Sequence, residues 1–470
     1  MVQFILNNQL VNPTQASGST VLDYIRYCKR LVGTKIGCRE GDCGACTILV
    51  GDFEEGKLVY RSMTSCLMPL GNANGKHIVS VEGINMKELT PVQQAMVDTN
   101  GTQCGFCTIG FVMSLTGFVL NDVTKNYEDA IAAIDGNICR CTGYKSIERA
   151  AAILSEKIND KPEEETIVWL VKQNFIPEYF LQIKERLKNL RETITATAIK
   201  NNEEKTLMLA GGTDLIVQNA LKVKQSVVEH LFDTNNLQGI KIENGLVHIG
   251  AAVTLTAFAE SELIQQIFSD LKKYIQLISS TPIRNMATMA GNLVNASPIG
   301  DMSIFFLALD SDLVLNKKGT VRTIKLKDFY KGYKQIDKDT DEIIEKIIFK
   351  APQKNSFNFE KVCKRAHLDI ASVNSACQLQ MSDDGVITDM HLAAGGVAPF
   401  PKYLKDTAAF LKGKEISAEN LKAAIEIMNT EISPISDARG TKEYKRLLLR
   451  QLFLAHFKHH EQNIKQVLGL

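Results

Sequence analysis

Long apolar segments are missing from this sequence of 470 residues, because no run reaches the 18 apolar residues that a membrane-spanning helix requires. An excess of one charge is missing too, since 54 Lys and Arg residues balance 53 Asp and Glu residues to a formal net charge of +1. Nucleic-acid-binding proteins need a clustered cationic surface, so this class is disfavoured. The opening MVQFILNNQLVNP lacks the basic start and unbroken apolar run of a signal peptide, and we expect a cytoplasmic protein.

What is present is the composition of a globular protein with several domains. Hydrophobic residues make up 45% and charged residues 23% of the chain, which is an ordinary balance. A single core does not grow to 470 residues, so we expect about three or four domains.

The first part of the chain predicts short strands around one helix. Two strands of a hairpin, 2–6 and 10–11, flank Asn7 and Asn8. A helix begins after Thr20, with Leu22, Ile25 and Cys28 on one face. The remaining predicted strands are 45–50, 57–61 and 77–81.

From Thr90 the apolar period becomes helical. Thr90 and Pro91 form an N-cap and first-turn pair. The predicted helices of this part are 91–98, 108–120, 128–134 and 144–158. The polar stretch that follows, with KPEEE inside it, predicts a linker.

Eleven cysteines are many for a cytoplasmic chain, and nine of them lie in the first 141 residues. A reducing compartment disfavours disulfides, so metal binding is the better hypothesis. The first quartet is Cys38, Cys43 and Cys46 in GCREGDCGAC, completed by Cys66. This C-x4-C-x2-C spacing with a distant fourth cysteine is the plant-type pattern for a [2Fe–2S] cluster. A structural zinc site is the alternative, but it usually has two closely spaced pairs.

The second quartet consists of Cys104, Cys107, Cys139 and Cys141, in QCGFC and ICRC. Each pair precedes a predicted helix, whose N-terminus carries free N–H groups and partial positive charge that suit a negatively charged cluster. Ligand type alone also allows zinc, but the neighbouring ferredoxin-type quartet favours a second cluster. Cys28, Cys363 and Cys377 remain, and we expect them to be buried small hydrophobes.

The segments GCREGDCGAC, QCGFCTIGFVMSL and GNICRCTGY resemble the two-cluster electron-transfer module of the molybdenum hydroxylases. The resemblance covers residues 1 to about 158 and includes all eight cysteines of the quartets. It implies a ferredoxin-like β-grasp domain followed by a four-helix domain whose cluster lies nearest the molybdopterin. Gln103 and Cys141 would then face the partner that carries molybdenum.

The segment TLMLAGGTDLIVQ reads as an apolar strand, a two-glycine turn and the start of a helix. Such a turn presents backbone N–H groups to a pyrophosphate with no Cβ in the way. It is not the Rossmann G-x-G-x-x-G fingerprint, and a purely structural strand–helix turn is the alternative.

Together with TPIRNMATMAGNLVNASPIGD, this turn resembles the FAD-binding domain of the same family, and FEKVCKRAHLDIASV resembles its flavoprotein C-terminal domain. The cofactor-binding residues that the resemblance implies are Met208, Leu209, Ala210, Gly211, Gly212, Thr213, Asp214, Leu215, Thr288, Gly291, Asn292, Asp301, Ile344 and Lys361. Lys361 and Arg284 could instead be exposed surface charges, and Asp301 could cap the helix 302–309.

We therefore predict a multidomain α+β protein. Its parts are a plant-type ferredoxin-like [2Fe–2S] domain at 1–82, a helical [2Fe–2S]-binding domain at 83–158, a linker at 159–190, an α+β FAD-binding domain at 191–356 and an α/β flavoprotein C-terminal domain at 357–470.

The resemblance implies an oxidoreductase subunit that relays electrons and has no catalytic residue of its own. Electrons from the oxidation of hypoxanthine and xanthine to urate on a larger molybdopterin-binding partner would pass through two [2Fe–2S] clusters to FAD and then to NAD+. The chain ends at Leu470, before any molybdopterin domain, so we expect a separate partner chain in a dimer of heterodimers.

Other functions remain open at this stage. The same relay could serve an aldehyde or another N-heterocycle, and oxygen could replace NAD+ as the acceptor. Two further classes are a free-standing flavin reductase and a non-enzymatic zinc-binding scaffold, which a visible absorption spectrum would separate from each other.

Overall fold

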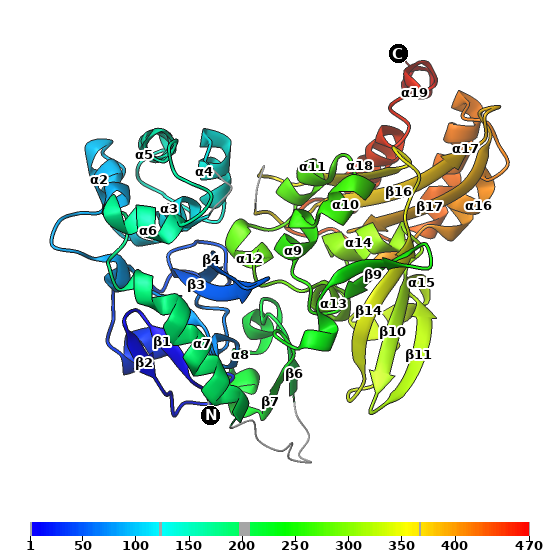
Figure 1. Ribbon diagram of the computed structural model, residues 1–470. Helices are drawn as coiled ribbons and strands as arrows, with labels where there is room; N and C mark the ends of the chain where they lie inside the picture. The colour runs from blue at the N-terminus through cyan, green and yellow to red at the C-terminus, as the bar shows by residue number, and fades with distance from the viewer. Residues whose placement is uncertain (1, 122–124, 197–206, 366–367, 470) are drawn as a thin grey trace. The chain divides into compact units, whose positions relative to one another are not determined.

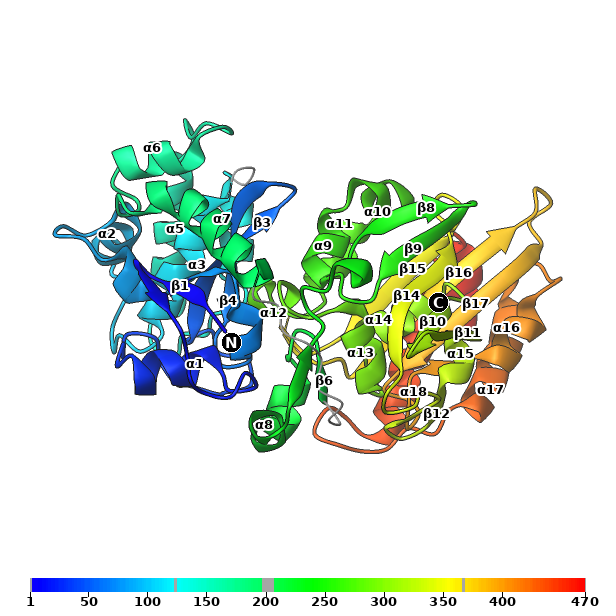
Figure 2. The same ribbon diagram turned by 60° about the horizontal axis from the view of Figure 1, so that its bottom comes forward.

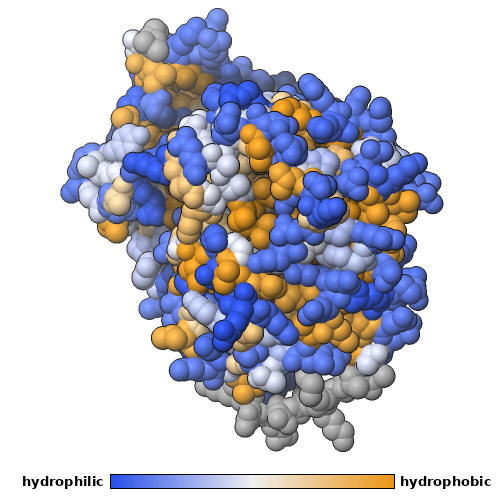
Figure 3. Space-filling model, turned by 90° about the vertical axis from the view of Figure 1, so that its left-hand side faces the viewer, coloured by the Kyte–Doolittle hydropathy of each residue, from blue (hydrophilic) through white to orange (hydrophobic). Residues whose placement is uncertain are grey.

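The computed structural model describes residues 2–121, 125–196, 207–365 and 368–469 (Figure 1). They form two compact units, the first from Met1–Phe232 with Ser280–Ala287 and the second from Asp233–Ser279 with Thr288–Leu470. Within the described ranges no helix has the length and apolar character needed to cross a membrane. The face in Figure 3 is mostly hydrophilic with apolar residues among them, as is usual for a protein surface.

A five-stranded mixed sheet opens the first unit, with the strand order β2-β1-β5-β3-β4. Its strands are β1 (Phe4–Leu6), β2 (Gln9–Val11), β3 (Thr47–Glu54), β4 (Lys57–Thr64) and β5 (His77–Val79). The predicted N-terminal hairpin forms, with Asn7 left-handed at φ 53°. β1 runs parallel to β5, and the other pairings are antiparallel. This is the predicted β-grasp arrangement.

The helix after Thr20 is a short α1 (Val21–Asp23) that continues as a π-helical turn, η1 (Tyr24–Cys28). Leu22 and Ile25 are buried in the core as predicted, but Cys28 is exposed. The prediction for Cys28 was wrong because the π turn, closed by the hydrogen bond from Lys29 N to Tyr24 O, widens the helical repeat and rotates Cys28 off the apolar face.

Four helices follow, as predicted: α2 (Pro91–Asp98), α3 (Thr108–Leu120), α4 (Tyr127–Ala133) and α5 (Lys145–Lys157). Thr90 and Gln93 form a capping box at the start of α2. α3 is apolar over most of its surface because it lies at the centre, packed against α2, α4 and strands β3 and β4.

Residues 159–190, predicted as a linker, contain α6 (Thr166–Lys172) and the start of α7 (Phe180–Ala196). The buried Leu170 and Phe180 join the core of the helical part, while Ile183 and Leu187 pack against Ile5 of the sheet. The connection is therefore a helical segment docked on both the four-helix part and the sheet of the unit. Polar composition concealed it because only one stripe of each helix is apolar.

His77 of β5 is buried beneath this docked segment, against the rings of Tyr60, Tyr179 and Phe180. Its Nε2–H donates to the carbonyl of Asn7 at 2.8 Å, and its Nδ1 accepts from the Tyr60 hydroxyl at 2.7 Å. Burial lowers the pKa of His77 to about 3.

We expect acid sensitivity from His77. Below its ordinary pKa of about 6.5 the unfolded chain binds a proton that the folded chain refuses, so stability falls by up to about 1.4 kcal/mol per pH unit until the pH approaches 3. The single Trp169 lies in α6 and reports unfolding of this unit. Urea unfolding followed by its fluorescence at pH 7 and pH 5 should show a smaller loss for His77→Gln than for the parent. The same loss in both would contradict the prediction, and His459→Gln, at an exposed position, is the control.

The first unit ends with the parallel pair β6 (Leu207–Leu209) and β7 (Val228–His230), joined by α8 (Leu215–Gln225). A separate segment, α12 (Thr281–Arg284), also belongs to this unit.

The second unit contains two antiparallel sheets (Figures 1 and 2). The first has the order β11-β10-β14-β9-β8, from β8 (Ile240–Glu243), β9 (Leu246–Gly250), β10 (Asp312–Lys317), β11 (Thr320–Lys325) and β14 (Ile343–Lys350). The helices before β10 are α9 (Leu255–Glu260), α10 (Glu262–Ile267), α11 (Leu271–Gln276), α13 (Met289–Asn295) and α14 (Asp301–Leu307). After β11 come α15 (Leu326–Phe329) and the small pair β12 (Tyr330–Gly332) and β13 (Gln335–Ile336).

The second sheet is the C-terminal one, in the order β15-β16-β17-β18. Its strands are β15 (Phe357–Val362), β16 (Val373–Met381), β17 (Ile387–Gly395) and β18 (Lys402–Tyr403). The helices that follow are α16 (Lys405–Leu411), α17 (Ala418–Glu431), α18 (Lys442–Ala455) and α19 (Glu461–Leu468). α14 packs against β16 and β17, which joins this sheet to the preceding part of the unit.

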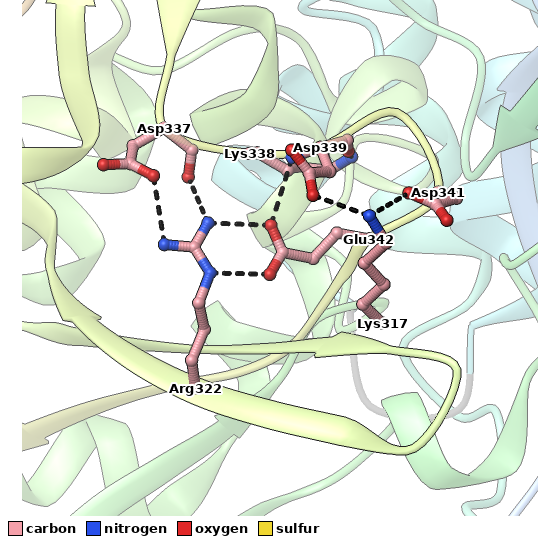
Figure 4. A network of polar contacts seen from close by, with 7 residues as sticks. All are labelled: Lys317, Arg322, Asp337, Lys338, Asp339, Asp341 and Glu342. Carbon is pink, nitrogen blue, oxygen red and sulfur yellow. Dashed lines mark hydrogen bonds and ion pairs between the residues drawn. The ribbon is translucent and has the colours of Figure 1, made fainter.

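Figure 4 shows a charged network that holds the loop before β14. Arg322 of β11 donates from Nε and Nη2 to both oxygens of Glu342, at 2.7 and 2.8 Å, and from Nη1 to Asp337 at 3.0 Å. The pKa of Glu342 lies below its ordinary value, chiefly because of the hydrogen bonds from Arg322. Lys317 pairs with Asp339 and Asp341 at the exposed rim of the network.

Replacing Arg322 with methionine is expected to destabilise the second unit by about 1–2 kcal/mol, because the carboxylate of Glu342, which is 3% exposed, loses its bidentate partner. Lys317→Met is the matched control with little effect, since exposed ion pairs contribute little. Thermal unfolding followed by circular dichroism compares the two variants. Equal midpoints would show that the burial of Glu342 does not matter.

Candidate functional site

The first cysteine quartet lies in the loop between η1 and β3, with Cys66 just after β4. The thiols of Cys38 and Cys43 contact each other, and those of Cys46 and Cys66 contact each other. Backbone N–H groups also point at sulfur, since Glu40 N lies 3.3 Å from Cys38 Sγ and Cys38 N lies 3.5 Å from Cys43 Sγ. The loop therefore supplies four thiols in two pairs, together with donors for negatively charged sulfur.

Glycines make this loop possible at specific positions. Gly41 and Gly44 have φ values of 80° and 67°, which favour glycine. A Cβ on Gly37 would lie 2.6 Å from Cys43 Sγ, so the backbone passes directly beneath the sulfur.

The second quartet has the same paired arrangement. Cys104 Sγ lies 3.7 Å from Cys141 Sγ, and the thiols of Cys107 and Cys139 contact each other. Cys107 is the N-cap residue of α3, and Thr142 N, shortly before α5, donates to Cys139 Sγ at 3.4 Å. Cys139 is buried whereas Cys104 and Cys141 are exposed, so one edge of this quartet reaches the surface.

The pairing of the cysteine thiols also changes their pKa values. The hydrogen bond from Cys43 lowers the pKa of Cys38 to about 5, and that from Cys66 lowers the pKa of Cys46. The pKa values of Cys43 and Cys66 are raised, first by the same hydrogen bonds. Burial raises the pKa of Cys107 to about 12. In such pairs one thiol gives its proton to a shared hydrogen bond and the other becomes the better thiolate, which is the form that binds iron.

The paired arrangement distinguishes two kinds of metal site. A tetrahedral zinc ion needs four ligands around one centre. Two pairs of thiols instead suit a [2Fe–2S] cluster, in which four cysteines bind two irons. Both quartets therefore fit the cluster better than zinc.

A short backbone connection joins the two quartets. Ile138 N, next to Cys139, donates to the carbonyl of Cys43 at 3.1 Å. Asn137 supports this contact, because its Nδ2 donates to Gly44 O at 3.2 Å and its Oδ1 accepts from Ser114 Oγ at 2.7 Å. A single hydrogen bond therefore links Cys43 of the first quartet to Ile138, the neighbour of Cys139 in the second quartet.

Arg284 contacts the helical part of the first unit. Its guanidinium donates to Asp135 Oδ2 at 2.7 Å, and the Arg284 and Asp135 side chains are only 10% and 6% exposed. Asp135 further accepts from Thr281 N at 2.7 Å. The surface-charge alternative for Arg284 is therefore wrong, since a buried guanidinium requires its carboxylate partner.

The two-glycine turn follows β6, with Met208 and Leu209 in the strand and Leu215 at the start of α8. Gly212 has φ 84°, and a Cβ on Gly211 would lie 1.8 Å from Met286 O. Thr213 and Asp214 complete the turn before α8. Backbone thus packs directly on backbone at Gly211, and a donor-rich loop of this kind is suited to a pyrophosphate.

Other predicted flavin residues lie in the second unit. The Thr288 hydroxyl caps α13 by accepting from Gly291 N at 3.2 Å, and Asn292 Oδ1 accepts from Ser303 N at 3.2 Å. Ile344 is buried in β14 at 4% exposure.

Asp301 and Lys361 form a buried ion pair in the second unit. Lys361 Nζ donates to Asp301 Oδ2 at 2.8 Å and to Leu277 O at 2.7 Å, and its side chain is 1% exposed. Asn374 Nδ2 donates to the other carboxylate oxygen at 2.6 Å. Gly300 is the N-cap residue of α14 and no side chain caps it, so Asp301 is not a cap. The alternative interpretations, in which Lys361 is an exposed surface charge and Asp301 is a helix cap, are therefore wrong.

Sequence reasoning missed Asn374 and Asn137. Asn374 lies beside Ser375 in the buried start of β16, and nothing in that short stretch of sequence marks it as a partner of Asp301. Asn137 stands inside the quoted GNICRC motif, and its place one residue before Ile138 and Cys139 could have identified it.

Family models match the chain in four consecutive parts. Residues 6–70 match a 2Fe-2S iron-sulfur cluster binding domain, and residues 80–152 a [2Fe-2S] binding domain. Residues 188–352 match the FAD binding domain in molybdopterin dehydrogenase, and residues 359–459 the CO dehydrogenase flavoprotein C-terminal domain.

Curated relatives align over nearly the whole chain. Xanthine dehydrogenase of Emericella nidulans is 30% identical over 85% of this chain and 34% of its own length. Xanthine dehydrogenase of Oryza sativa is 27% identical over 99% of this chain and 40% of its own length. The chain therefore spans well under half of these relatives. Among solved structures, a chain of the reconstituted CO dehydrogenase from Oligotropha carboxidovorans is 25% identical with a TM-score of 0.50, over 55% of this chain and 91% of that one.

Proposed function

Because the chain belongs, through the four domains it carries, to the iron–sulfur and flavin components of the molybdenum hydroxylase family, we propose that it is the electron-transfer subunit of a xanthine dehydrogenase. In this function it receives electrons from a larger molybdopterin-binding partner that oxidises hypoxanthine and xanthine to urate. It passes them through two [2Fe–2S] clusters and FAD to NAD+. Matches to curated xanthine dehydrogenases over 85–99% of the chain support the purine substrate.

The observation that carries the proposal is the arrangement of both cysteine quartets as pairs of thiols in one compact unit. When bound, the clusters carry one electron at a time, and FAD accepts one or two and exchanges hydride with a nicotinamide. The chain's own residues hold and insulate these groups. Buried Cys46, Cys66 and Cys139 keep water from the sulfur, while N–H groups of Glu40 and Thr142 stabilise its negative charge.

The second quartet offers a surface for the molybdenum-bearing partner. Cys104 and Cys141 are exposed, and the large side chains of Phe106, Ile138 and Tyr144 beside them are 46%, 38% and 37% exposed. A partner that covers the second quartet would bury these apolar side chains. This supports a partner that covers the second quartet, as expected for Gln103 and Cys141.

We assign FAD contacts to the glycine turn and to the other flavin residues that the sequence predicts. The turn 208–215 would bind the pyrophosphate through N–H groups, and the buried Asp301–Lys361 pair would set polar contacts of the flavin domain. NAD+ would meet the flavin directly. We place the complex in the cytoplasm as a dimer of heterodimers, where reducing conditions keep the cysteines as thiols.

Analysis of the native complex tests the proposal. Purification through a tag on this chain should yield a larger chain with molybdenum, together with iron, acid-labile sulfide and FAD in a red-brown protein. A complex without molybdenum would contradict the proposal, and a colourless protein would indicate a zinc scaffold.

Turnover of the purified complex identifies the substrate class. Hypoxanthine and xanthine should be oxidised with NAD+ as acceptor and faster than aldehydes or other N-heterocycles. Preference for an aldehyde, or for another N-heterocycle, would leave the electron-transfer function in place but would show that the purine substrate is wrong. Reduction of a carrier by NADH with this chain alone would indicate a free-standing flavin reductase.

A further inference from the structure

Asn72 lies where the first iron–sulfur domain meets the glycine turn, within the first compact unit. It belongs to the 3-10 turn η2 (Leu70–Ala73), shortly after Cys66. Its side chain is buried at 3% exposure, and both ends of its amide are used. Nδ2 donates to Ala210 O at 2.8 Å, and Oδ1 lies 3.0 Å from His230 Nδ1.

His230 fixes the orientation of this amide. A carbonyl such as Ala210 O only accepts, so the Asn72 amide must turn its NH2 group to Ala210 and its oxygen to His230. The His230 ring then donates from Nδ1, and burial keeps it neutral by lowering its pKa to about 4. A Cβ on Gly71 would lie 2.1 Å from this ring, so the ring rests directly on backbone and cannot shift away.

The hydrogen bond from Asn72 fixes the Ala210 carbonyl, and this determines where the N–H group of Gly211 points. The peptide bond between Ala210 and Gly211 is trans, since the described residues contain no cis peptide bond. In a trans peptide the C=O and N–H groups point in opposite directions. With Ala210 O held toward Asn72, Gly211 N–H points to the opposite side. The hydrogen bonds of the described residues include none from this N–H group.

The glycine turn also packs against the segment after Cys66 at Gly212. A Cβ on Gly212 would lie 2.9 Å from Leu67 O, and Leu67 and Leu70 share an apolar core with Leu209 and Ile216. The body of the turn is therefore fixed by packing, and the Asn72 amide adds control over one peptide plane.

We propose that Asn72 is a positioning residue for the flavin, which orients the Ala210–Gly211 peptide so that Gly211 N–H donates to a phosphate oxygen of FAD. This inference rests on the proposed function, because it requires that the turn binds the FAD pyrophosphate. Rotation of this peptide would replace a donor at the anion by a carbonyl oxygen, which repels it.

Asn72→Asp tests the donor without changing the shape of the side chain. A carboxylate still accepts from His230 but repels Ala210 O, so the peptide is no longer held. We expect FAD affinity to fall at least about tenfold, as for loss of a hydrogen bond to a charged group. Asn72→Ala should show a smaller loss in the same direction. Asn74→Ala is the matched control, since Asn74 follows the same turn and accepts from Gln3 N at 2.8 Å.

The measurement uses the purified complex. FAD dissociation is followed by flavin fluorescence, and the phosphorus NMR signals of bound FAD are compared at saturating FAD. Shifted pyrophosphate signals with unchanged iron content in Asn72→Asp are the expected result. Wild-type affinity and wild-type signals in this variant would overturn the inference. A parent complex without FAD would instead overturn the proposed function itself.

Discussion

Cys139→Ser is expected to remove the second cluster and to leave the first cluster and FAD in place. Cys139 is 6% exposed and its thiol is paired with Cys107, so a serine at this position leaves one iron without its thiolate at the buried edge of the quartet. Iron and acid-labile sulfide should fall by about half, since two similar clusters share them. Reduction of FAD by the purine substrate should slow by at least about a hundredfold, because even residues outside the ligand set change metal sites by up to that factor.

The same variant should keep NADH-driven reduction of FAD, because hydride enters at the flavin and does not pass the second cluster. Iron analysis, electron paramagnetic resonance and stopped-flow absorbance separate these effects. Cys28→Ser is the control, since Cys28 is exposed and outside both quartets. If Cys139→Ser retained all its iron, or wild-type reduction by purine, the second quartet would not be the entry point of electrons.

Gly211→Ala should weaken FAD binding strongly while both clusters remain. The added methyl group would stand 1.8 Å from Met286 O, which is backbone, so the turn must move rather than a flexible side chain. Such overpacking costs about 1–3 kcal/mol or more, which corresponds to about a tenfold to hundredfold loss of affinity if it falls on the bound state.

The control for this variant is Gly56→Ala in the turn between β3 and β4. Gly56 has φ 80° and no atom within 4 Å of an added Cβ, so it tests backbone strain without a clash. FAD content from flavin absorbance, set against iron content, gives the result. Retention of FAD in Gly211→Ala would remove the glycine turn from the flavin site.

Local sequence signals predicted much of the fold because they depend on neighbours in the chain. The bounds of α2 and α3 agree with prediction to the residue, since Thr90 with Pro91, and Cys107 before an apolar run, mark their starts. The N-terminal hairpin followed from its Asn-Asn turn. The spacing of Cys38, Cys43, Cys46 and Cys66 predicted a cluster loop, and the second quartet was predicted from its place beside the first and from the family resemblance.

Predictions failed where contacts between distant residues decide. Cys28 lies outside the core because a π turn rotates it off the apolar face. The polar segment 159–190 contains helices because other parts of the unit cover the narrow apolar stripe of each helix. Arg284 is buried because Asp135 lies beside it, although 149 residues separate the two in sequence. No local pattern encodes such a pair.

The sequence by itself determined the spacing of the cysteines and the order of the domains, because these depend on covalent distance along the chain. Only the tertiary structure decided how the thiols divide into pairs, that Cys43 and Ile138 connect the quartets, and that Asn72 holds Ala210. These are hydrogen bonds and contacts between segments far apart in sequence, and they form only when the packing of whole domains brings the partners together.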